Sequence, residues 1–598
     1  MLVLCRSLGG NQNADKHRMV PPFYFIMKKI LFSLIISIFI NINTVWADYS
    51  TTVKTIEGVE IQVSISETYK EAKIKSRESQ TSAIDKNTEG TVTIPTIVDG
   101  YPVTSIGNYA FRDCSKITKL VLPSTLSSVD DGCVRGCYAL EEITMSGTGN
   151  TVQCIGNCIL QYSDMYEGWE LTAGTKKSVI PNNVKRISRY AFELTAIQQV
   201  NIPSSVTDIE EEAFALCEEL SSLTFSEGLI EIGRNSFRGC GKLTQIEFPS
   251  TLQTIGAGAF AGTSLKSIFI PANVSRIGQF GYRMSINSFP ASTLEKIEVD
   301  ENNATYDSRD NCNAIILKNS YLYGTALVSG CKNTKIPEGI ELIWANAFLG
   351  CPFSSVSIPS SVKTISSYAF HNCENLESLY IPASVVDISN DAFSSCSGLK
   401  SIIVEDGNIK YDSRDNCNAL IIKDYEYSYF DGEEYKERIG ACLLQGSINT
   451  KIPEGVEVIA DYAFSCIQGL KSLVIPSSIR RIGSAFTDSG LETVYSYIEE
   501  PYDLGGNQFN IHESDGHLFG PSTLYVPKGT REKYLEKEGW NLFRNIYEMG
   551  DVNGIADIKK LEMQTEVYTL SGMRQKSMTQ GLNIIRKSDG TSYKVLIK

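Results

Sequence analysis

The stretch SSVKTISSYAFHNCENLESLYIP, Ser360 to Pro382, contains the unit from which most of the chain is built. At its centre stands Ala369-Phe370, which we call the landmark pair, with Cys373 three residues later. The landmark pair recurs, with small changes, at Ala110-Phe111, Ala191-Phe192, Ala213-Phe214, Ser236-Phe237, Ala259-Phe260, Gly281-Tyr282, Ala347-Phe348, Ala392-Phe393, Ala463-Phe464, Ala485-Phe486 and, in a degenerate form, Cys133-Val134. Adjacent copies lie 22 or 23 residues apart.

A fixed period of this length, with leucines spaced L-x-x-L-x-L, predicts a leucine-rich-repeat solenoid that is strand-rich and has short helical turns. Within one unit, Leu379 and Ile381 face one side of a strand, while Ser378 and Tyr380 face the other. One coil cannot bury its apolar side alone, so the coils must stack and share a core. A dozen coils stacked at roughly 4.8 Å predict an elongated body on the order of 60 Å or more.

The repeat, written I-G-x-x-A-F-x-x-C-x-x-L-x-x-L-x-I-P, resembles the BspA-like family of bacterial surface-antigen leucine-rich repeats. The resemblance covers roughly residues 90 to 500 and is specific because the pattern returns so often. It implies a secreted or surface-displayed protein, and several members of the family are adhesins for host or bacterial ligands. The period and the composition alone do not show this.

The N-terminal region predicts export. Met27-Lys28-Lys29 precedes an apolar run from Ile30 to Ile42, and Ala47 stands just before Asp48, as in a secretory signal peptide over residues 27–47. A membrane anchor is the alternative, but the run is short for a span. We interpret residues 1–26 as an upstream artefact of the gene start or a leader extension. Residues 48–90 lack the repeat and are expected to form an N-terminal cap.

The predicted solenoid, residues 91–500, has two kinds of interruption. The first, near 156–177, carries aromatic residues among acidic ones. The second occurs near 300–335 and 405–450, where Tyr306 to Ile316 returns almost unchanged as Tyr411 to Ile421. The apolar and aromatic runs that follow predict inserted hairpins. Insertions into a solenoid often gather on its binding face.

The C-terminal region divides into a cap and a tail. Residues 501–549 are expected to cap the solenoid, with a helix between Thr530 and Tyr547. Residues 550–598 contain three short apolar runs separated by glycines, which predict a small β segment. The motif V-Y-x-L-S-G, then G-L-N-I-I and a closing K-V-L-I-K, resembles the sorting segments of type IX secretion cargo. That resemblance implies delivery to the cell surface or the medium.

Composition and motifs disfavour several functions. The formal net charge of −14 argues against a nucleic-acid partner. The chain has four histidines and lacks the standard catalytic signatures, so we predict a protein that is not an enzyme and needs no metal or cofactor. His512 and His517 flank two acidic residues and are a candidate metal cluster, but the glycines around them favour a surface loop.

The sixteen cysteines invite a disulfide framework in an exported chain. Many stand three residues after a landmark pair, at a position that Thr195, Thr263 and Ser489 occupy in other coils. Exchange with threonine and serine favours small, buried, free thiols. The pairs Cys133 with Cys137, Cys154 with Cys158, and Cys312 with Cys331 are the alternative.

The run Asp307-Ser308-Arg309-Asp310-Asn311 and its second copy offer oxygen ligands that suit calcium. The same residues are also typical of a structural turn, in which Asp and Asn side chains bond to nearby backbone. We favour the turn, because an arginine lies inside the run.

The outward strand positions are the candidate binding surface. Most are Ser, Thr or other polar residues, and Phe269, Tyr380, Ile403 and Tyr495 are expected to be exposed among them. A solvated sheet whose aromatics pack across strands explains the pattern equally well. We predict a secreted or surface-displayed binding protein whose partner is an extracellular protein or glycan. A structural scaffold without a discrete ligand is the alternative.

Overall fold

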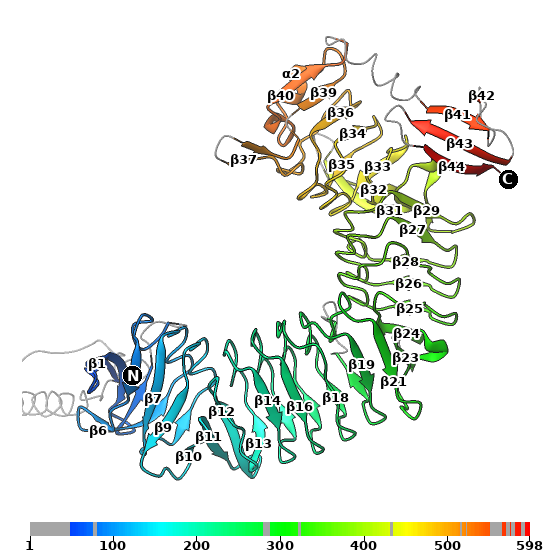
Figure 1. Ribbon diagram of the computed structural model, residues 1–598. Coiled ribbons are helices and arrows are strands. Elements are labelled where there is room, and N and C mark those ends of the chain that lie inside the picture. The colour runs from blue at the N-terminus through cyan, green and yellow to red at the C-terminus, as the bar shows by residue number, and fades with distance from the viewer. Residues whose placement is uncertain are drawn as a thin grey trace, which may run out of the picture.

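The computed structural model describes residues 48–75, 81–278, 287–320, 324–430, 435–514, 517–521 and 523–550, with four strands between 565 and 597. The predicted signal peptide at 27–47, residues 1–26 and the landmark pair Gly281-Tyr282 lie outside the described residues. Figure 1 shows the coils side by side in one open arc. The prediction of a repeat solenoid is confirmed.

A series of short parallel sheets follows the arc and takes one strand from most coils; we call these sheets together the main ladder. Its strands coincide with the L-x-x-L-x-I segments, so that Leu379 and Ile381 are buried and Ser378 and Tyr380 are exposed. The strands are β4 (Gly90–Thr93), β7 (Ile117–Pro123), β9 (Glu142–Ser146), β14 (Gln199–Ile202), β16 (Ser222–Phe225), β19 (Ser267–Ile270), β21 (Lys296–Val299), β27 (Ser378–Ile381), β29 (Ser401–Val404), β34 (Ser472–Ile475), β36 (Thr493–Ser496), β39 (Thr523–Val526) and β40 (Asn545–Glu548).

A second series of parallel strands, the second ladder, forms where the chain returns before the landmark pairs, and it is divided among four sheets. Its strands are mostly two residues long, because only the buried isoleucine or valine and its neighbour pair with the next coil. They are β6 (Tyr101–Ile106), β8 (Ser128–Val129), β13 (Val184–Ile187), β15 (Asp208–Ile209), β17 (Glu231–Ile232), β18 (Thr254–Ile255), β20 (Arg276–Ile277), β25 (Leu342–Ile343), β26 (Thr364–Ile365), β28 (Asp387–Ile388), β33 (Val456–Ile459) and β35 (Arg481–Ile482).

The landmark pairs form the third corner of each coil, as short turns. Ala369 N–H donates to Ser366 O within its own coil, which is the three-residue spacing of a tight helical turn. Phe370 N–H donates instead to Ala392 O of the next coil. The Phe370 ring stacks on Phe393, with 5.2 Å between the ring centroids. Each coil is therefore joined to the next at three corners by hydrogen bonds and at its centre by aromatic packing.

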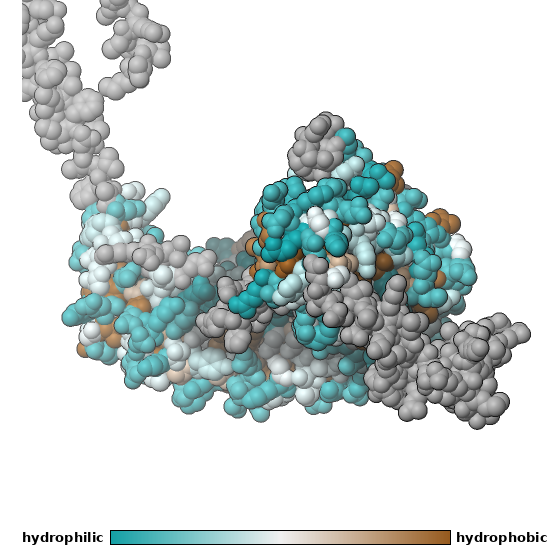
Figure 2. All heavy atoms as spheres, turned by 90° about the horizontal axis from the view of Figure 1, so that it is seen from above, coloured by the Kyte–Doolittle hydropathy of each residue, from teal (hydrophilic) through white to brown (hydrophobic). Residues whose placement is uncertain are grey.

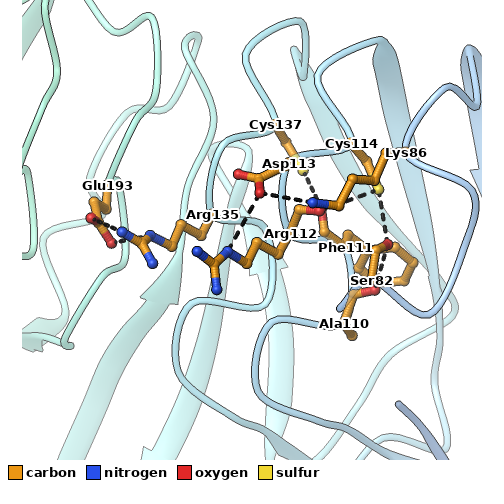
Figure 3. A network of polar contacts seen from close by, with 10 residues as sticks. All are labelled: Ser82, Lys86, Ala110, Phe111, Arg112, Asp113, Cys114, Arg135, Cys137 and Glu193. Carbon is orange, nitrogen blue, oxygen red and sulfur yellow. Dashed lines mark hydrogen bonds and ion pairs between the residues drawn. The ribbon is translucent and has the colours of Figure 1, made fainter. Parts of the chain in front are cut away.

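The cysteines that follow the landmark pairs connect successive coils. Cys137 Sγ donates to Phe111 O at 3.1 Å, and Cys373 Sγ donates to Phe348 O at 3.2 Å. At the N-terminal end, Ser82 Oγ takes part in the same column and lies 3.1 Å from Cys114 Sγ (Figure 3). All cysteines in the described residues are free. The prediction of free thiols is confirmed for them, and the three alternative disulfides do not form.

Three inserted hairpins interrupt the stack. Their elements are β10 (Val152–Ile155), β11 (Cys158–Ser163) and β12 (Gly168–Ala173); β22 (Tyr306–Asp307), η1 (Arg309–Asn311), β23 (Ile315–Ser320) and β24 (Gly324–Ser329); and β30 (Tyr411–Asp412), η2 (Arg414–Asn416), β31 (Leu420–Phe430) and β32 (Tyr435–Gln445). In each insert the hairpin is antiparallel, and its returning strand pairs in parallel with the second ladder, at β13, β25 and β33.

The three inserts share the geometry of their base, although only the second and third carry the repeated run, with η1 and η2. Each returning strand is followed directly by a glycine, Gly174, Gly330 or Gly446. The glycine N–H donates to the backbone oxygen of the landmark alanine in the next coil. Four residues later a hydroxyl donates to the backbone oxygen of an asparagine at the start of the hairpin. The pairs are Ser178 with Asn157 (2.8 Å), Thr334 with Asn313 (2.5 Å) and Thr450 with Asn418 (2.8 Å).

The strands at the base of each hairpin lie across the core and divide it into four blocks, that is, four separate clusters of buried residues. Along β23, Ile315 and Leu317 pack into the block that precedes the insert, whereas Ile316 packs into the block that follows. The same alternation places Leu420 and Ile421 on opposite sides of β31. Figure 1 shows the arc turning close to β21–β24 and again close to β31–β33.

Both ends of the solenoid are covered. The N-terminal cap adds β1 (Tyr49–Lys54), β2 (Glu60–Ser66), β3 (Glu71–Ile74) and β5 (Ile97–Val98) to the edge of β6. At the C-terminal end, α2 (Arg531–Leu535) and η3 (Trp540–Leu542) precede β40, and β37 (His512–Ser514) pairs with β38 (His517–Phe519). The helix expected between Thr530 and Tyr547 is thus five residues long, and the rest of that stretch returns to the main ladder.

The tail forms a four-stranded antiparallel sheet in the order β42-β41-β43-β44. Its strands are β41 (Thr565–Thr569), β42 (Arg574–Gln575), β43 (Gly581–Lys587) and β44 (Ser592–Ile597). Three of them coincide with the apolar runs of the sequence, and β42 is an additional short strand.

Candidate ligand-binding surface

The outward side of the main ladder carries three of the four predicted site residues in exposed positions. Phe269, Tyr380 and Ile403 are 50%, 46% and 51% exposed. They protrude because side chains alternate along a strand, and each neighbour in sequence is buried. In Figure 2 the visible surface is mostly hydrophilic, with scattered apolar patches.

Only two of the four residues are direct neighbours. Tyr380 in β27 stands opposite Ile403 in β29, so that the two side chains form one apolar pair on adjacent strands. Phe269 stands opposite Glu298 instead, and the second insert separates it from Tyr380. Burial, followed by the negative charge of Glu405, raises the pKa of the Tyr380 hydroxyl.

Tyr495 differs from the expectation that it is exposed. Its side chain is half-buried, because the ring of Tyr525 stacks on it with 4.9 Å between the centroids and 9° between the planes. Tyr525 in turn contacts Tyr547, at 5.8 Å and 34°. The three tyrosines stand in register on β36, β39 and β40. Tyr495 is therefore the first of three tyrosines in a row and not an isolated exposed ring.

The row was missed in the sequence for a definite reason. Leu524-Tyr525-Val526-Pro527 has the L-x-V-P form of a repeat strand, so that Tyr525 could have been placed on the outward side. Tyr547 stands in Asn545–Glu548, which lacks both the leucine spacing and the terminal proline. Nothing in the repeat pattern marks that segment as a strand.

The distal parts of the hairpins contact the second ladder through charged and aromatic groups. In the first insert, the Arg186 guanidinium of β13 lies 4.1 Å from the Tyr166 ring centroid. In the third, Tyr427 Oη donates to Glu457 Oε2 at 2.5 Å, and Arg438 Nε lies 2.8 Å from the same carboxylate. One side of the first and of the third hairpin is thus held against the coil that follows. On the other side of the third hairpin, Ile439 is 60% exposed.

The run that is repeated in the second and third inserts, Asp307 to Asn311 and its second copy, is a turn. Arg309 Nε and Nη2 donate to the two carboxylate oxygens of Asp307 at 2.9 and 2.6 Å, and Arg414 contacts Asp412 in the same way. Both oxygens of each carboxylate are thus bonded to an arginine, although calcium would need them as ligands. The following residue, Asp310, has a positive φ of 57°, as a tight turn requires.

A tyrosine in each run closes an open edge of the second ladder. Ile277 N–H, on β20, donates to Tyr306 Oη at 2.9 Å, and Ile388 N–H, on β28, donates to Tyr411 Oη at 2.8 Å. Each of these strands is the last of its sheet, so the hydroxyl replaces the carbonyl of a further strand. Burial raises the pKa of both tyrosines to about 12.

The described residues contain no assembly that points to catalysis or metal binding. No group of three or more His, Cys, Asp or Glu side chains in them could hold a metal ion. His371 Nδ1 lies 2.7 Å from Ser394 Oγ, and burial lowers the pKa of the imidazole. The side chains of His512 and His517 lie outside the described part of the structure. In the described part of the chain, no helix is long and apolar enough to cross a bilayer.

Comparisons with known proteins agree with the repeat. The model of the BspA type leucine rich repeat region matches in six copies, over residues 88–173, 166–287, 315–423 and 441–512. A search of curated proteins gave no match.

Several solved structures of bacterial leucine-rich-repeat proteins are similar at low identity. A leucine rich cell surface protein from Faecalibacterium prausnitzii is 22% identical, with a TM-score of 0.38, over 85% of this chain and 97% of that one. A leucine-rich repeat protein from Bacteroides ovatus is 21% identical, with a TM-score of 0.31, over 70% and 94%. The pneumococcal vaccine antigen PcpA is 13% identical, with a TM-score of 0.34, over 83% and 98%.

Proposed function

Because this chain belongs to the BspA-type leucine-rich-repeat family, we propose that it is a non-enzymatic surface protein that binds an extracellular protein or glycan. The main ladder and the distal hairpins supply the binding surface. One observation carries the proposal: Phe269, Tyr380 and Ile403 are about half exposed, and each has a serine two residues earlier on the same side of its strand. Exposed apolar groups on a rigid sheet are favourable contacts for a partner.

We also propose that the protein is exported and displayed outside the cell. The apolar run behind Lys28 and Lys29 supports removal of a signal peptide at Ala47. The tail at 550–598 supports delivery by type IX secretion, on the basis of its V-Y-x-L-S-G motif and its three matching strands. An epitope tag placed before residue 550 and detected on intact cells tests display. Its loss from the cell surface when residues 550–598 are deleted tests the sorting role.

The binding surface is tested with a paired substitution. The chain from residue 48, with Tyr380→Ser and Ile403→Ser, is compared with the unchanged protein on an array of purified extracellular matrix proteins and surface glycans. Ile97→Ser removes an equally exposed apolar side chain from β5 and is the matched control. We expect the paired substitution to weaken capture by about tenfold and the control to leave it unchanged.

Two results would contradict the proposal. Equal capture by the paired variant and the unchanged protein would remove the main ladder as the binding surface. Association of the protein only with itself, across the whole array, would favour a structural scaffold over a binding protein.

A further inference from the structure

The last four strands of the main ladder present an outward surface without charge. β34, β36, β39 and β40 form one continuous parallel sheet. Its outward residues form two rows, Ser472, Thr493, Thr523 and Asn545 in the first and Val474, Tyr495, Tyr525 and Tyr547 in the second. None of these eight residues is charged, although 21% of the chain is Asp, Glu, Lys or Arg.

The same uncharged character occurs at β14 and β16 and at β27 and β29, but there it extends over two strands and not four. Other outward positions of the main ladder are charged. Near the N-terminal end, the outward positions include Lys119 and Glu142, which form an ion pair at 2.8 Å between neighbouring strands. Further along, Lys296 and Glu298 pair at 2.8 Å on β21. A solvated sheet therefore tolerates charge elsewhere in this protein, and the last four strands are the widest uncharged sheet in the described part of the main ladder.

The second row provides an aromatic strip. Tyr495, Tyr525 and Tyr547 lie in van der Waals contact along the ladder, and Tyr547 at the end of the strip is 43% exposed. Tyr497, two residues after Tyr495 on the same side of the chain, is 47% exposed. The strip therefore combines ring carbons with phenolic hydroxyls, and the first row adds hydroxyl and amide groups beside it.

We propose that this surface, the tyrosine strip and its neighbouring polar row, binds an uncharged polysaccharide. A sugar chain offers C–H faces to the rings and hydroxyls to the polar row. A surface without charge suits such a chain, because no carboxylate or ammonium group has to lose its water without an opposite charge to replace it. Groups of one kind recur on successive strands at about 4.8 Å, which suits a polymer of repeating units. The inference rests on the proposed binding function and names the partner class at one part of the ladder.

Charges near the surface are held at its border. Lys471 and Glu492, one residue before β34 and β36, pair with each other at 2.9 Å. At the opposite end of the strands, Glu548 accepts a hydrogen bond from Arg531 N–H at 3.2 Å. An anionic or cationic polymer would find no charged partner on the eight central residues, so the central surface favours neither.

The test is native electrophoresis of the chain from residue 48 in gels that contain a polysaccharide. The probes are neutral glucan, mannan, xylan and galactan, with polygalacturonate and heparin as charged counterparts. We expect at least one neutral polymer to retard the protein and the charged polymers to leave its mobility relative to a non-binding protein unchanged. Tyr525→Ser with Tyr547→Ser should raise the dissociation constant by about tenfold.

Two further variants keep the result independent of folding. Tyr547→Phe retains the ring and is expected to bind within about threefold of the unchanged protein, whereas Thr523→Lys places a charge in the polar row and should weaken binding while the thermal unfolding midpoint is kept. Retardation by no neutral polymer, or equal retardation of the Tyr525→Ser, Tyr547→Ser variant, would overturn the inference. If the Tyr380→Ser, Ile403→Ser variant loses capture on the array while no neutral polymer retards the protein, then the proposed binding function holds and the polysaccharide inference is wrong.

Discussion

Three glycines show how single residues allow the hairpins to enter the stack. Gly174, Gly330 and Gly446 occupy the place where an uninterrupted coil has its landmark phenylalanine. A Cβ at these positions would lie 2.0, 2.1 and 2.0 Å from the ring of Phe192, Phe348 or Phe464. Because the insert supplies no ring of its own, the ring of the next coil lies over the glycine. A side chain there would force the two coils apart.

Gly446→Ala is therefore expected to destabilise the protein by about 2 kcal/mol or more, since a methyl group must displace the buried Phe464 ring. Chemical denaturation followed by circular dichroism measures the change. Gly241→Ala is the matched control, because a Cβ at Gly241 meets no atom within 4 Å. A Gly446→Ala protein as stable as this control would show that the insert does not pack as described.

A buried ion pair at the first insert gives a second prediction at this scale. Arg135 Nε lies 2.6 Å from Glu193 Oε2, and the Glu193 side chain is only 2% exposed (Figure 3). Burial raises the pKa of Glu193, and Arg135 opposes that effect. Arg135→Ala leaves a buried carboxylate unpaired and should cost about 2 kcal/mol, less than a fully buried pair because Arg135 reaches solvent.

The control for this prediction is Lys242→Ala, which breaks the exposed pair with Glu219. Its cost should stay within about 0.5 kcal/mol. Equal costs for the two substitutions in the same denaturation experiment would mean that the Glu193 site is open to water.

At the scale of elements, one carboxylate binds both strands of the third hairpin. Glu457 of β33 accepts hydrogen bonds from Tyr427 and Arg438, which stand opposite each other on β31 and β32. Burial alone would raise the pKa of Glu457, but these two bonds outweigh it and lower that pKa. The charged form of the Glu457 carboxylate therefore holds the distal hairpin against β33.

Glu457→Gln should speed hydrogen exchange in the strands 424–430 and 435–440 while the base at 441–445 keeps its protection. The contribution of the charged carboxylate is fully present above the ordinary glutamate pKa of about 4.3. It is lost as the pH falls through the lower pKa of the folded state. Glu426→Gln, on the exposed side of the same hairpin, is the control. Unchanged exchange in the Glu457→Gln protein would refute the anchoring role.

The elements also show where sequence reasoning succeeded and where it failed. The main ladder was predictable because its inward leucines, its isoleucine and its proline recur at one spacing. The shared base of the three inserts was not visible, because it depends on one glycine and one hydroxyl in each insert, with hairpins of different length between them. The tyrosine row at β39 and β40 was missed for a related reason. β40 pairs with β39 through backbone hydrogen bonds, and its side chains do not follow the repeat pattern.

The stacking of coils governs the molecule as a whole. An uninterrupted coil with a landmark phenylalanine contributes the same three corners and one central ring as the next such coil, so the two contact their neighbours in nearly the same way. Thr364 on β26 pairs with Asp387 on β28, 23 residues later. The same surface of β25 could therefore receive either strand.

Removal of residues 364–386 is expected to yield a folded protein that is one coil shorter, because Lys363 would then join Asp387 and place β28 against β25. Removal of residues 364–375 takes out half a coil, brings unlike positions into register and should abolish cooperative unfolding. Circular dichroism and X-ray scattering distinguish the two. The whole-coil variant should keep a radius of gyration well above the roughly 24 Å of a compact globule of this length. If both deletions unfold the protein, or if the scattering shows a compact globule, then the coils are not interchangeable layers of one solenoid.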